Sequence, residues 1–134
     1  MIVCDVNLIA YILIPGVHTE AAERIYAIDS DWVAPPLWRS EFASVLVNSV
    51  RTAMLKQTHA DAAWAKAPAL LVAEQEPDLL GAMHLAVKRN ISAYDAQYVA
   101  LARALGTVVV TADRALVRRC PDHSVSMRRF VDGG

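Results

Sequence analysis

Two short apolar runs, each followed closely by an aspartate, constrain the fold of this chain more than any other feature. The first runs from Met1 to Cys4 and ends at Asp5, and the second is the β-branched run from Thr107 to Thr111 before Asp113. Apolar runs of this length are typical of parallel strands that are buried on both faces. Trp32-Val-Ala34 predicts a third such strand, because two prolines close it.

Segments with helical character separate these predicted strands. The predicted helices span Val6 to Ile14, Thr19 to Asp29, Leu37 to Leu55, Thr58 to Glu74 with a kink at Pro68, Leu79 to Lys88, Ser92 to Gly106, and a short stretch after Asp113. Val125-Ser-Met127 predicts an edge strand. Strands that alternate with helices imply an α/β fold of three layers, with a central, mainly parallel sheet of four to five strands. The 134 residues, of which 55% are hydrophobic, predict one domain over residues 1–134.

Several classes of protein are disfavoured by composition. The uncharged stretch from Val6 to Val17 contains Pro15 and Gly16 and is far shorter than the roughly 20 apolar residues of a membrane span. No basic segment followed by an apolar one suggests a signal peptide. The two cysteines, Cys4 and Cys120, form neither a zinc motif nor a disulfide framework. We therefore expect a cytoplasmic protein with no membrane segment.

Four acidic residues fall at the expected ends of elements rather than on polar helix faces. Asp5 ends the first strand, and Asp113 follows the β-branched strand. Glu41 lies in the first turn or two of the long helix from Leu37, and Asp95 lies in the first turn of the helix from Ser92. The carboxyl ends of parallel strands meet at one edge of a sheet, where such sheets bind ligands. Asp95 precedes a strand, so it reaches that edge only if the preceding turn brings its helix start there.

Each acid also has a purely structural explanation that the sequence leaves open. Asp5-Val-Asn7 could form a turn in which the side chain bonds local backbone. Glu41 could favour a helix N-terminus through the macrodipole. Ser92 and Asp95 fit a capping box, and Asp113 could cap the short helix after it.

A gathering of all four acids would require neutralisation. Unit charges about 4 Å apart cost about 4 kcal/mol per pair at an effective dielectric constant near 20. Bound cations or shifted pKa values relieve such repulsion. Magnesium prefers oxygen ligands and keeps several waters, so four carboxylates could hold one or two ions. Two ions about 4 Å apart can activate a water and stabilise the leaving oxygen of a phosphodiester.

The chain resembles the PIN-domain ribonucleases, of the kind that serve as VapC-like toxins in toxin–antitoxin pairs. The matching segments are Ile2-Val-Cys-Asp-Val-Asn-Leu8, Ser40-Glu-Phe-Ala43, Tyr94-Asp-Ala-Gln-Tyr-Val-Ala-Leu-Ala102 and Val109-Val-Thr-Ala-Asp-Arg114. None of these segments is specific by itself. Their occurrence in the family's order over residues 2 to 114 is specific.

The resemblance implies a PIN-like fold in which the start of the Asp95 helix reaches the common edge of the sheet. It also implies that Asp5, Glu41, Asp95 and Asp113 form a catalytic metal site for Mg²⁺, with Mn²⁺ as an alternative. Asp5 and Asp95 are the expected direct ligands. Glu41 and Asp113 are expected to complete the site or to orient waters.

Other residues are expected to support this site. Asn7 and Thr111 match small polar residues of the family and are expected to hold the carboxylates or the waters of the metal by hydrogen bonds. Arg114, with Arg118 and Arg39, is expected to contact RNA phosphates, from position and charge. The formal net charge is only -1, and a solvated helix face explains the arginine-rich C-terminal third equally well.

The expected function is hydrolysis of RNA phosphodiester bonds by a metal-activated water. The resemblance further implies a cognate antitoxin protein that silences the chain, and a homodimer. One alternative is a catalytically inactive PIN-like binding or scaffolding module. A phosphotransfer domain with a phospho-accepting aspartate is disfavoured, because Asp5 has no acidic neighbour and Lys56, Lys66 and Lys88 are the only lysines.

Overall fold

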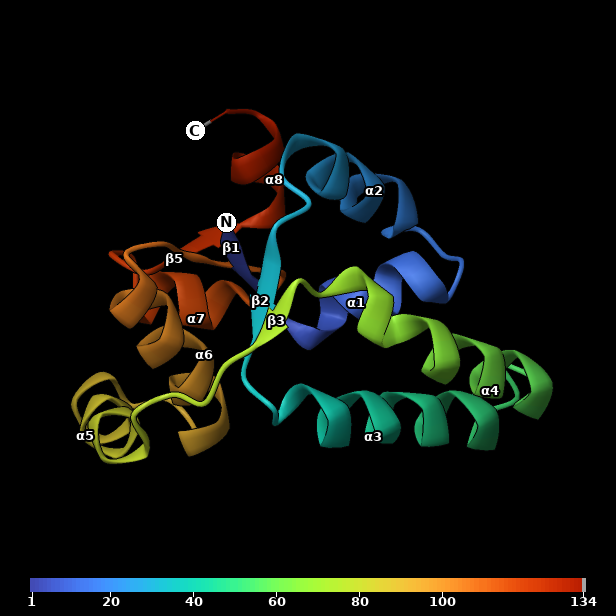
Figure 1. Cartoon of the computed structure of the whole chain (residues 1–134), viewed down its shortest axis with the longest axis horizontal. Coiled ribbons are helices and arrows are strands. Elements are labelled where there is room, and N and C mark those ends of the chain that lie inside the picture. Colours follow the sequence, from blue (N-terminus) through green and yellow to red (C-terminus); the bar gives the residue numbers. More distant parts are fainter. Residues whose placement is uncertain (134) are drawn as a thin grey trace.

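The computed structural model describes residues 1–133 and has three layers, with a five-stranded sheet between two layers of helices (Figure 1). The strands are β1 (Ile2–Cys4), β2 (Trp32–Ala34), β3 (Ala73–Glu74), β4 (Val109–Thr111) and β5 (Ser124–Ser126). Their order is β3-β2-β1-β4-β5, and every neighbouring pair is parallel. The predicted three-layer α/β/α fold is therefore confirmed.

Helices connect the strands and cover both faces of the sheet. They are α1 (Val6–Leu13), α2 (Thr19–Ile28), α3 (Trp38–Arg51), α4 (Gln57–Lys66), the 3-10 helix η1 (Ala67–Leu70), α5 (Leu79–Arg89), α6 (Ala93–Leu105), α7 (Arg114–Arg119) and α8 (Met127–Val131). Figure 1 shows α5, α6 and α7 on one side of the sheet and α1, α3 and α4 on the other. Within residues 1–133, no helix combines the length and the apolar character that crossing a membrane requires.

The three central strands are the apolar runs of the sequence. Val3, Cys4, Val109 and Val110 are fully buried, because helices cover both faces of the sheet. Trp32 is also fully buried and packs edge-on against the ring of α2 residue Tyr26, with ring centroids 5.1 Å apart. Burial on both faces is the reason that these strands show no polar alternation.

One predicted helix is wrong in its second half. The helix expected from Thr58 to Glu74 ends at Lys66, and Pro68 lies in the 3-10 helix that follows. Proline lacks a backbone N–H and clashes with the preceding turn, so here it ends the α-helix rather than kinking it. The chain then pairs with β2 as the edge strand β3, flanked by bonds from the Val72 N–H to the Trp32 carbonyl and from the Gln75 N–H to the Ala34 carbonyl.

The path of the chain creates a switch point between β1 and β4. From β1 the chain moves to β2 and then β3 on one side, and it returns to β4 and β5 on the other side. The connections that leave β1 and β4 therefore diverge. Open parallel sheets bind ligands in the crevice at the carboxyl end of such a switch point. Asp5 and Asp113 follow these two strand ends.

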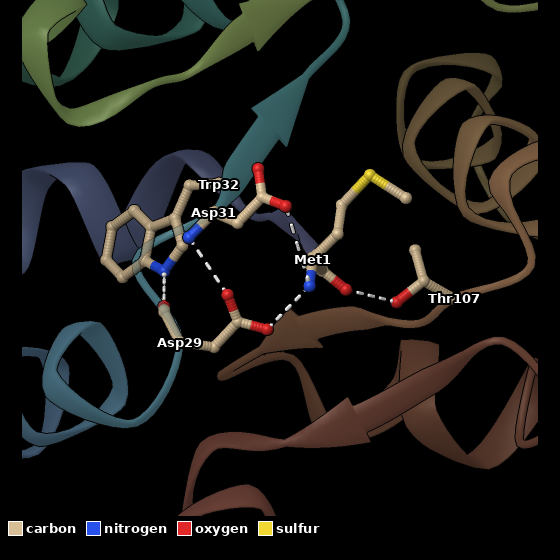
Figure 2. Close-up of polar contacts among 5 residues, drawn as sticks. All are labelled: Met1, Asp29, Asp31, Trp32 and Thr107. Carbon is tan, nitrogen blue, oxygen red and sulfur yellow. Dashed lines mark hydrogen bonds and ion pairs between the residues drawn. The ribbon is translucent and has the colours of Figure 1, made fainter.

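The opposite rim, at the amino ends of the strands, is closed by contacts around Met1 (Figure 2). The Met1 ammonium group lies 2.7 Å from Asp29 Oδ2 and 3.8 Å from Asp31 Oδ2. Thr107 Oγ1 donates a hydrogen bond to the Met1 carbonyl at 2.6 Å, and Trp32 Nε1 donates to the Asp29 carbonyl at 2.7 Å. The acids of this rim thus have a cationic partner within the fold.

Candidate metal centre

Asp5 lies at the carboxyl end of β1, where it is also the N-cap of α1. Its Oδ2 accepts a hydrogen bond from Thr111 Oγ1 at 2.6 Å, and its Oδ1 accepts one from the Asn7 N–H at 3.4 Å. Thr111 is fully buried at the end of β4, so this bond joins the two strands at the switch point. Both expected supporting residues therefore contact Asp5, although Asn7 does so through its backbone.

Asp113 lies next to Asp5 on the same rim, two residues beyond β4. Its N–H donates to Thr111 Oγ1 at 3.0 Å, so one hydroxyl group connects Asp113 and Asp5. Asp113 Oδ1 accepts from the N–H groups of Ala115 and Leu116 at 2.9 and 3.1 Å, as the N-cap of α7. The capping role suggested by the sequence is present, and it fixes the carboxylate at the rim.

Asp95 reaches this rim because of the direction of its helix. A short loop connects α6 to β4, so α6 runs antiparallel to the strands and begins at their carboxyl ends. The other end of α6 lies near the amino rim, where Thr107 contacts Met1. Ser92 caps the helix, with its Oγ accepting from the Asp95 N–H at 2.9 Å, as the sequence predicted.

Glu41 lies in the first turn of α3 and is held by a residue that the sequence analysis did not identify. Its Oε1 accepts a hydrogen bond from the Tyr98 hydroxyl at 2.5 Å. Tyr98 is 3% exposed and stands one turn after Asp95 on α6. Its helical spacing predicted only a core position. The available signal was a tyrosine at a buried position, because a buried phenol normally has a hydrogen-bond partner.

Burial and nearby negative charge raise the pKa values of Asp5, Glu41 and Asp95. Burial raises the pKa of Asp5, and the nearby charges of Asp95 and Asp113 add to this effect against the bonds from Thr111 and Asn7. Burial also raises the pKa of Glu41, with Asp5 and Asp95 contributing, despite the bond from Tyr98. For Asp95, burial and then the charge of Asp113 raise the pKa. The acids therefore share one electrostatic environment.

The carboxylates do not form a closed ligand set in this structure. Among residues 1–133, no three histidine, cysteine, aspartate or glutamate side chains lie together as the ligands of a bound ion do. The ion pairs of the described residues also include none of the four acids. The structure nevertheless brings Asp5, Glu41, Asp95 and Asp113 to one rim, near enough for their charges to repel one another.

The three arginines expected to bind phosphate lie in two places. Arg114 and Arg118 border a hollow of about 210 Å³ beside Asp113 and are exposed. Arg39 is on α3, where its Nε lies 2.7 Å from Glu74 Oε1 at the end of β3. Two of the three arginines are therefore free of ion pairs within residues 1–133, and the third is paired with Glu74.

A family model described as "PIN domain" matches residues 2–120 of the chain. The chain is also 32% identical over 124 residues to the Ribonuclease VapC3 of Pyrobaculum aerophilum, and the match covers 90% of this chain and 95% of that protein. The chain belongs to the PIN-domain family. The resemblance inferred from the four sequence segments is confirmed, and this PIN domain is VapC-like.

The fold of this PIN domain is also similar to a solved structure. The crystal structure of PAE2754 from Pyrobaculum aerophilum matches it with a TM-score of 0.78, over 98% of this chain and 93% of that chain. The two sequences are 18% identical, so this likeness shows the fold alone.

Proposed function

We propose that this PIN domain is a divalent-metal-dependent endoribonuclease that hydrolyses phosphodiester bonds of RNA. The observation that carries the proposal is the gathering of Asp5, Glu41, Asp95 and Asp113 at the edge of the sheet formed by the carboxyl ends of the strands, the carboxyl rim. These acids have no cationic partner there within residues 1–133. The name of the similar Ribonuclease VapC3 supports RNA as the substrate.

The chemistry of this rim fits a hard divalent cation. Carboxylate oxygens are the ligands that Mg²⁺ and Mn²⁺ prefer. The raised pKa values reflect burial and mutual repulsion, both of which a cation would offset. We propose that Asp5 and Asp95 bind the ion directly and that Glu41 and Asp113 complete the site or orient water.

A bound ion would supply positive charge that lowers the pKa of the attacking water and offsets charge on the phosphate. The residues of the chain would prepare the site for it. Thr111 and the Asn7 backbone fix the oxygens of Asp5, and the start of α7 fixes Asp113. Arg114 and Arg118 stand beside Asp113 and would contact the RNA backbone. Arg39 could do so only by sharing its guanidinium with Glu74.

We further propose that residues 1–134 act as one domain, as the toxin of a toxin–antitoxin pair and as a homodimer. A free ribonuclease would harm its own cell, so a cognate antitoxin protein is expected to silence it. Exposed apolar side chains support the existence of protein partners. Val47 and Trp64 border an apolar groove between α3 and α4, and Leu80, Met83 and Val87 are exposed on α5.

Removal and return of the metal test this proposal. Purified protein is incubated with a single-stranded RNA of mixed sequence, with EDTA, and again after excess Mg²⁺ or Mn²⁺ is restored. We expect cleavage to stop with EDTA and to return with either ion. Unchanged cleavage in EDTA would contradict metal dependence. Saturable metal binding without cleavage of any RNA would favour the inactive binding module instead.

A further inference from the structure

Tyr98 stands between the two helices that carry Glu41 and Asp95. It comes from α6, three residues after Asp95, and its ring is 3% exposed. Its hydroxyl donates to Glu41 Oε1 at 2.5 Å, so the bond crosses from α6 to α3. Packing alone does not require a phenol here, because an apolar ring would fill the same core position.

Among the described residues, one hydrogen bond holds the Glu41 carboxylate, whereas two hold each of the carboxylates of Asp5 and Asp113. Asp5 accepts from Thr111 and Asn7, and Asp113 accepts from two backbone N–H groups. Within residues 1–133, Tyr98 is the sole hydrogen-bond donor to the Glu41 carboxylate. Glutamate has one more rotatable side-chain bond than aspartate, so it also has more freedom to lose before it can bind a ligand.

The bond also places the two carboxylate oxygens of Glu41 in different environments. Oε1 is occupied by the phenol, and Oε2 has no donor within residues 1–133. Hydrogen bonds to the far side of a ligand commonly fix its orientation and tune its affinity for a metal. A phenol suits this position, because it is rigid, neutral and able to donate from inside the core.

We propose that Tyr98 is a positioning residue, which holds Glu41 so that its free oxygen faces the divalent cation or a water of that cation. The proposal rests on the function proposed above. Tyr98 itself does not contact substrate and acts entirely through Glu41. The ring of Tyr98 is part of the core, and the proposed positioning role belongs to its hydroxyl alone.

The test uses Tyr98→Phe, which removes the hydroxyl and keeps the ring. Titration calorimetry with Mn²⁺ alone measures metal affinity, and thermal unfolding measures stability. We expect the affinity for Mn²⁺ to fall about tenfold, the lower end of what loss of a ligand's supporting hydrogen bond produces. Tyr26→Phe is the matched control. Tyr26 is half-buried against Trp32, near the opposite rim, and its substitution should leave the affinity unchanged.

A double-mutant cycle separates positioning from a structural role. In a Glu41→Gln background, Tyr98→Phe should cause no further loss of Mn²⁺ affinity, because its route to the metal is gone. An equal loss in both backgrounds would overturn the proposal, as would wild-type affinity in Tyr98→Phe. If either of these results is found but the wild-type protein binds Mn²⁺ and cleaves RNA, the role of Tyr98 is disproved and the proposed function survives. If wild-type protein does neither, both proposals fail.

A measurement on the protein with Tyr98 in place guards against misfolding of the Tyr98→Phe variant. The chain has four tyrosines, and substitution of the other three assigns their ring ¹³Cζ resonances by elimination. Addition of Mg²⁺ should shift the resonance of Tyr98 and leave that of Tyr26 in place. An unshifted Tyr98 resonance at saturating Mg²⁺ would contradict the proposal.

Discussion

At the scale of single residues, the acids of the carboxyl rim have structural and chemical roles together. Asp5 and Asp113 cap α1 and α7, as a purely structural interpretation of the sequence predicts. The caps use backbone N–H groups and hold each carboxylate at the rim, where burial and the charge of Asp113 raise the pKa values of Asp5 and Asp95. The structural interpretation therefore explains how the acids are placed, and it does not compete with the proposed metal site.

Asp95→Asn should separate activity from stability. The amide keeps the shape of the side chain but removes a charge that is half-buried and close to Asp113. We expect RNA cleavage to fall by about 100-fold or more, a loss typical of removing one group from a site that stabilises charge. The melting temperature of the metal-free protein should stay the same or rise by a few degrees. Asp122→Asn, at an exposed aspartate in the turn before β5, is the control.

The cleavage rate and the melting temperature of Asp95→Asn, compared with those of Asp122→Asn, each test one part of this prediction. Full cleavage by purified Asp95→Asn would remove Asp95 from the site. A large drop in melting temperature would show instead that the carboxylate supports the fold, since removal of repulsion cannot destabilise a protein.

Thr111→Val tests the hydroxyl that joins Asp5 and Asp113. Valine has a similar shape, but it would leave the Asp5 carboxylate and the Asp113 N–H without this partner. Loss of a buried partner of this kind costs about 1–3 kcal/mol of unfolding free energy. We also expect weaker Mn²⁺ binding, measured by calorimetry. Thr107→Val removes a hydroxyl at the other rim and should lower stability without changing Mn²⁺ affinity.

At the scale of elements, the sequence predicts the buried strands and misses a strand that main-chain hydrogen bonds alone hold in the sheet. The central strands β1, β2 and β4 were predictable, because burial on both faces leaves an apolar run. The strand β3 was not, since its residues Ala73 and Glu74 are exposed and are held by backbone bonds to β2. The short helix α8 was missed for a different reason, because five residues are too few to show a helical periodicity.

The candidate site likewise contains residues whose positions the sequence predicts and residues whose positions or roles it does not. Asp5 and Asp113 follow strand ends, so their shared rim was predictable from the sequence. The position of Asp95 depends on the direction of α6, which only the connection to β4 fixes. Tyr98 could not be assigned, because helical spacing does not distinguish a buried ring from a buried ring with a bonded hydroxyl.

Ser92→Ala tests whether the start of α6 matters to the site. Loss of an N-cap side chain costs about 1 kcal/mol of stability, and here the capped N–H belongs to Asp95 itself. We expect a lower melting temperature and a several-fold loss of cleavage, with recovery of both in Ser92→Thr. Asp78→Ala removes the corresponding cap of α5 and should lower stability alone. Equal cleavage by the two alanine variants would contradict this account.

At the scale of the whole molecule, the two rims of the sheet differ in electrostatics. At the amino rim, burial raises the pKa of Asp29, but hydrogen bonds from the Met1 ammonium and the Asp31 N–H outweigh it and leave the pKa below its usual range. At the carboxyl rim, the pKa values of Asp5, Glu41 and Asp95 are raised. The metal-free fold therefore contains one neutralised rim and one that carries unbalanced negative charge.

This difference predicts a pH dependence of stability. Carboxyls with raised pKa values bind protons more tightly in the folded state than in the unfolded state. Their stabilising effect is full below the ordinary carboxyl pKa and is lost as the pH rises through the raised values of Asp5, Glu41 and Asp95. Metal-free protein should thus be destabilised by this rim at neutral pH.

Mg²⁺ should reverse that loss, and more strongly at higher pH, because protons and Mg²⁺ compete for the same oxygens. At 100 times its dissociation constant, a ligand raises the unfolding free energy by about 2.7 kcal/mol. Thermal unfolding with Mg²⁺ and with EDTA, at about pH 5 and about pH 8, compares the stabilisation by Mg²⁺ at high and low proton concentration. An equal or larger shift at the lower pH would contradict the prediction, and Asp5→Asn should abolish the shift at both.

The most direct test of the central claim is an anomalous difference map from crystals of the protein soaked in Mn²⁺. We predict one or two peaks at the carboxyl rim, at coordination distance from oxygens of Asp5 and Asp95 and with Glu41 and Asp113 in the same shell or bonded to its waters. An empty carboxyl rim at saturating Mn²⁺, or peaks confined to Asp29 and Asp31 at the opposite rim (Figure 2), would contradict the claim.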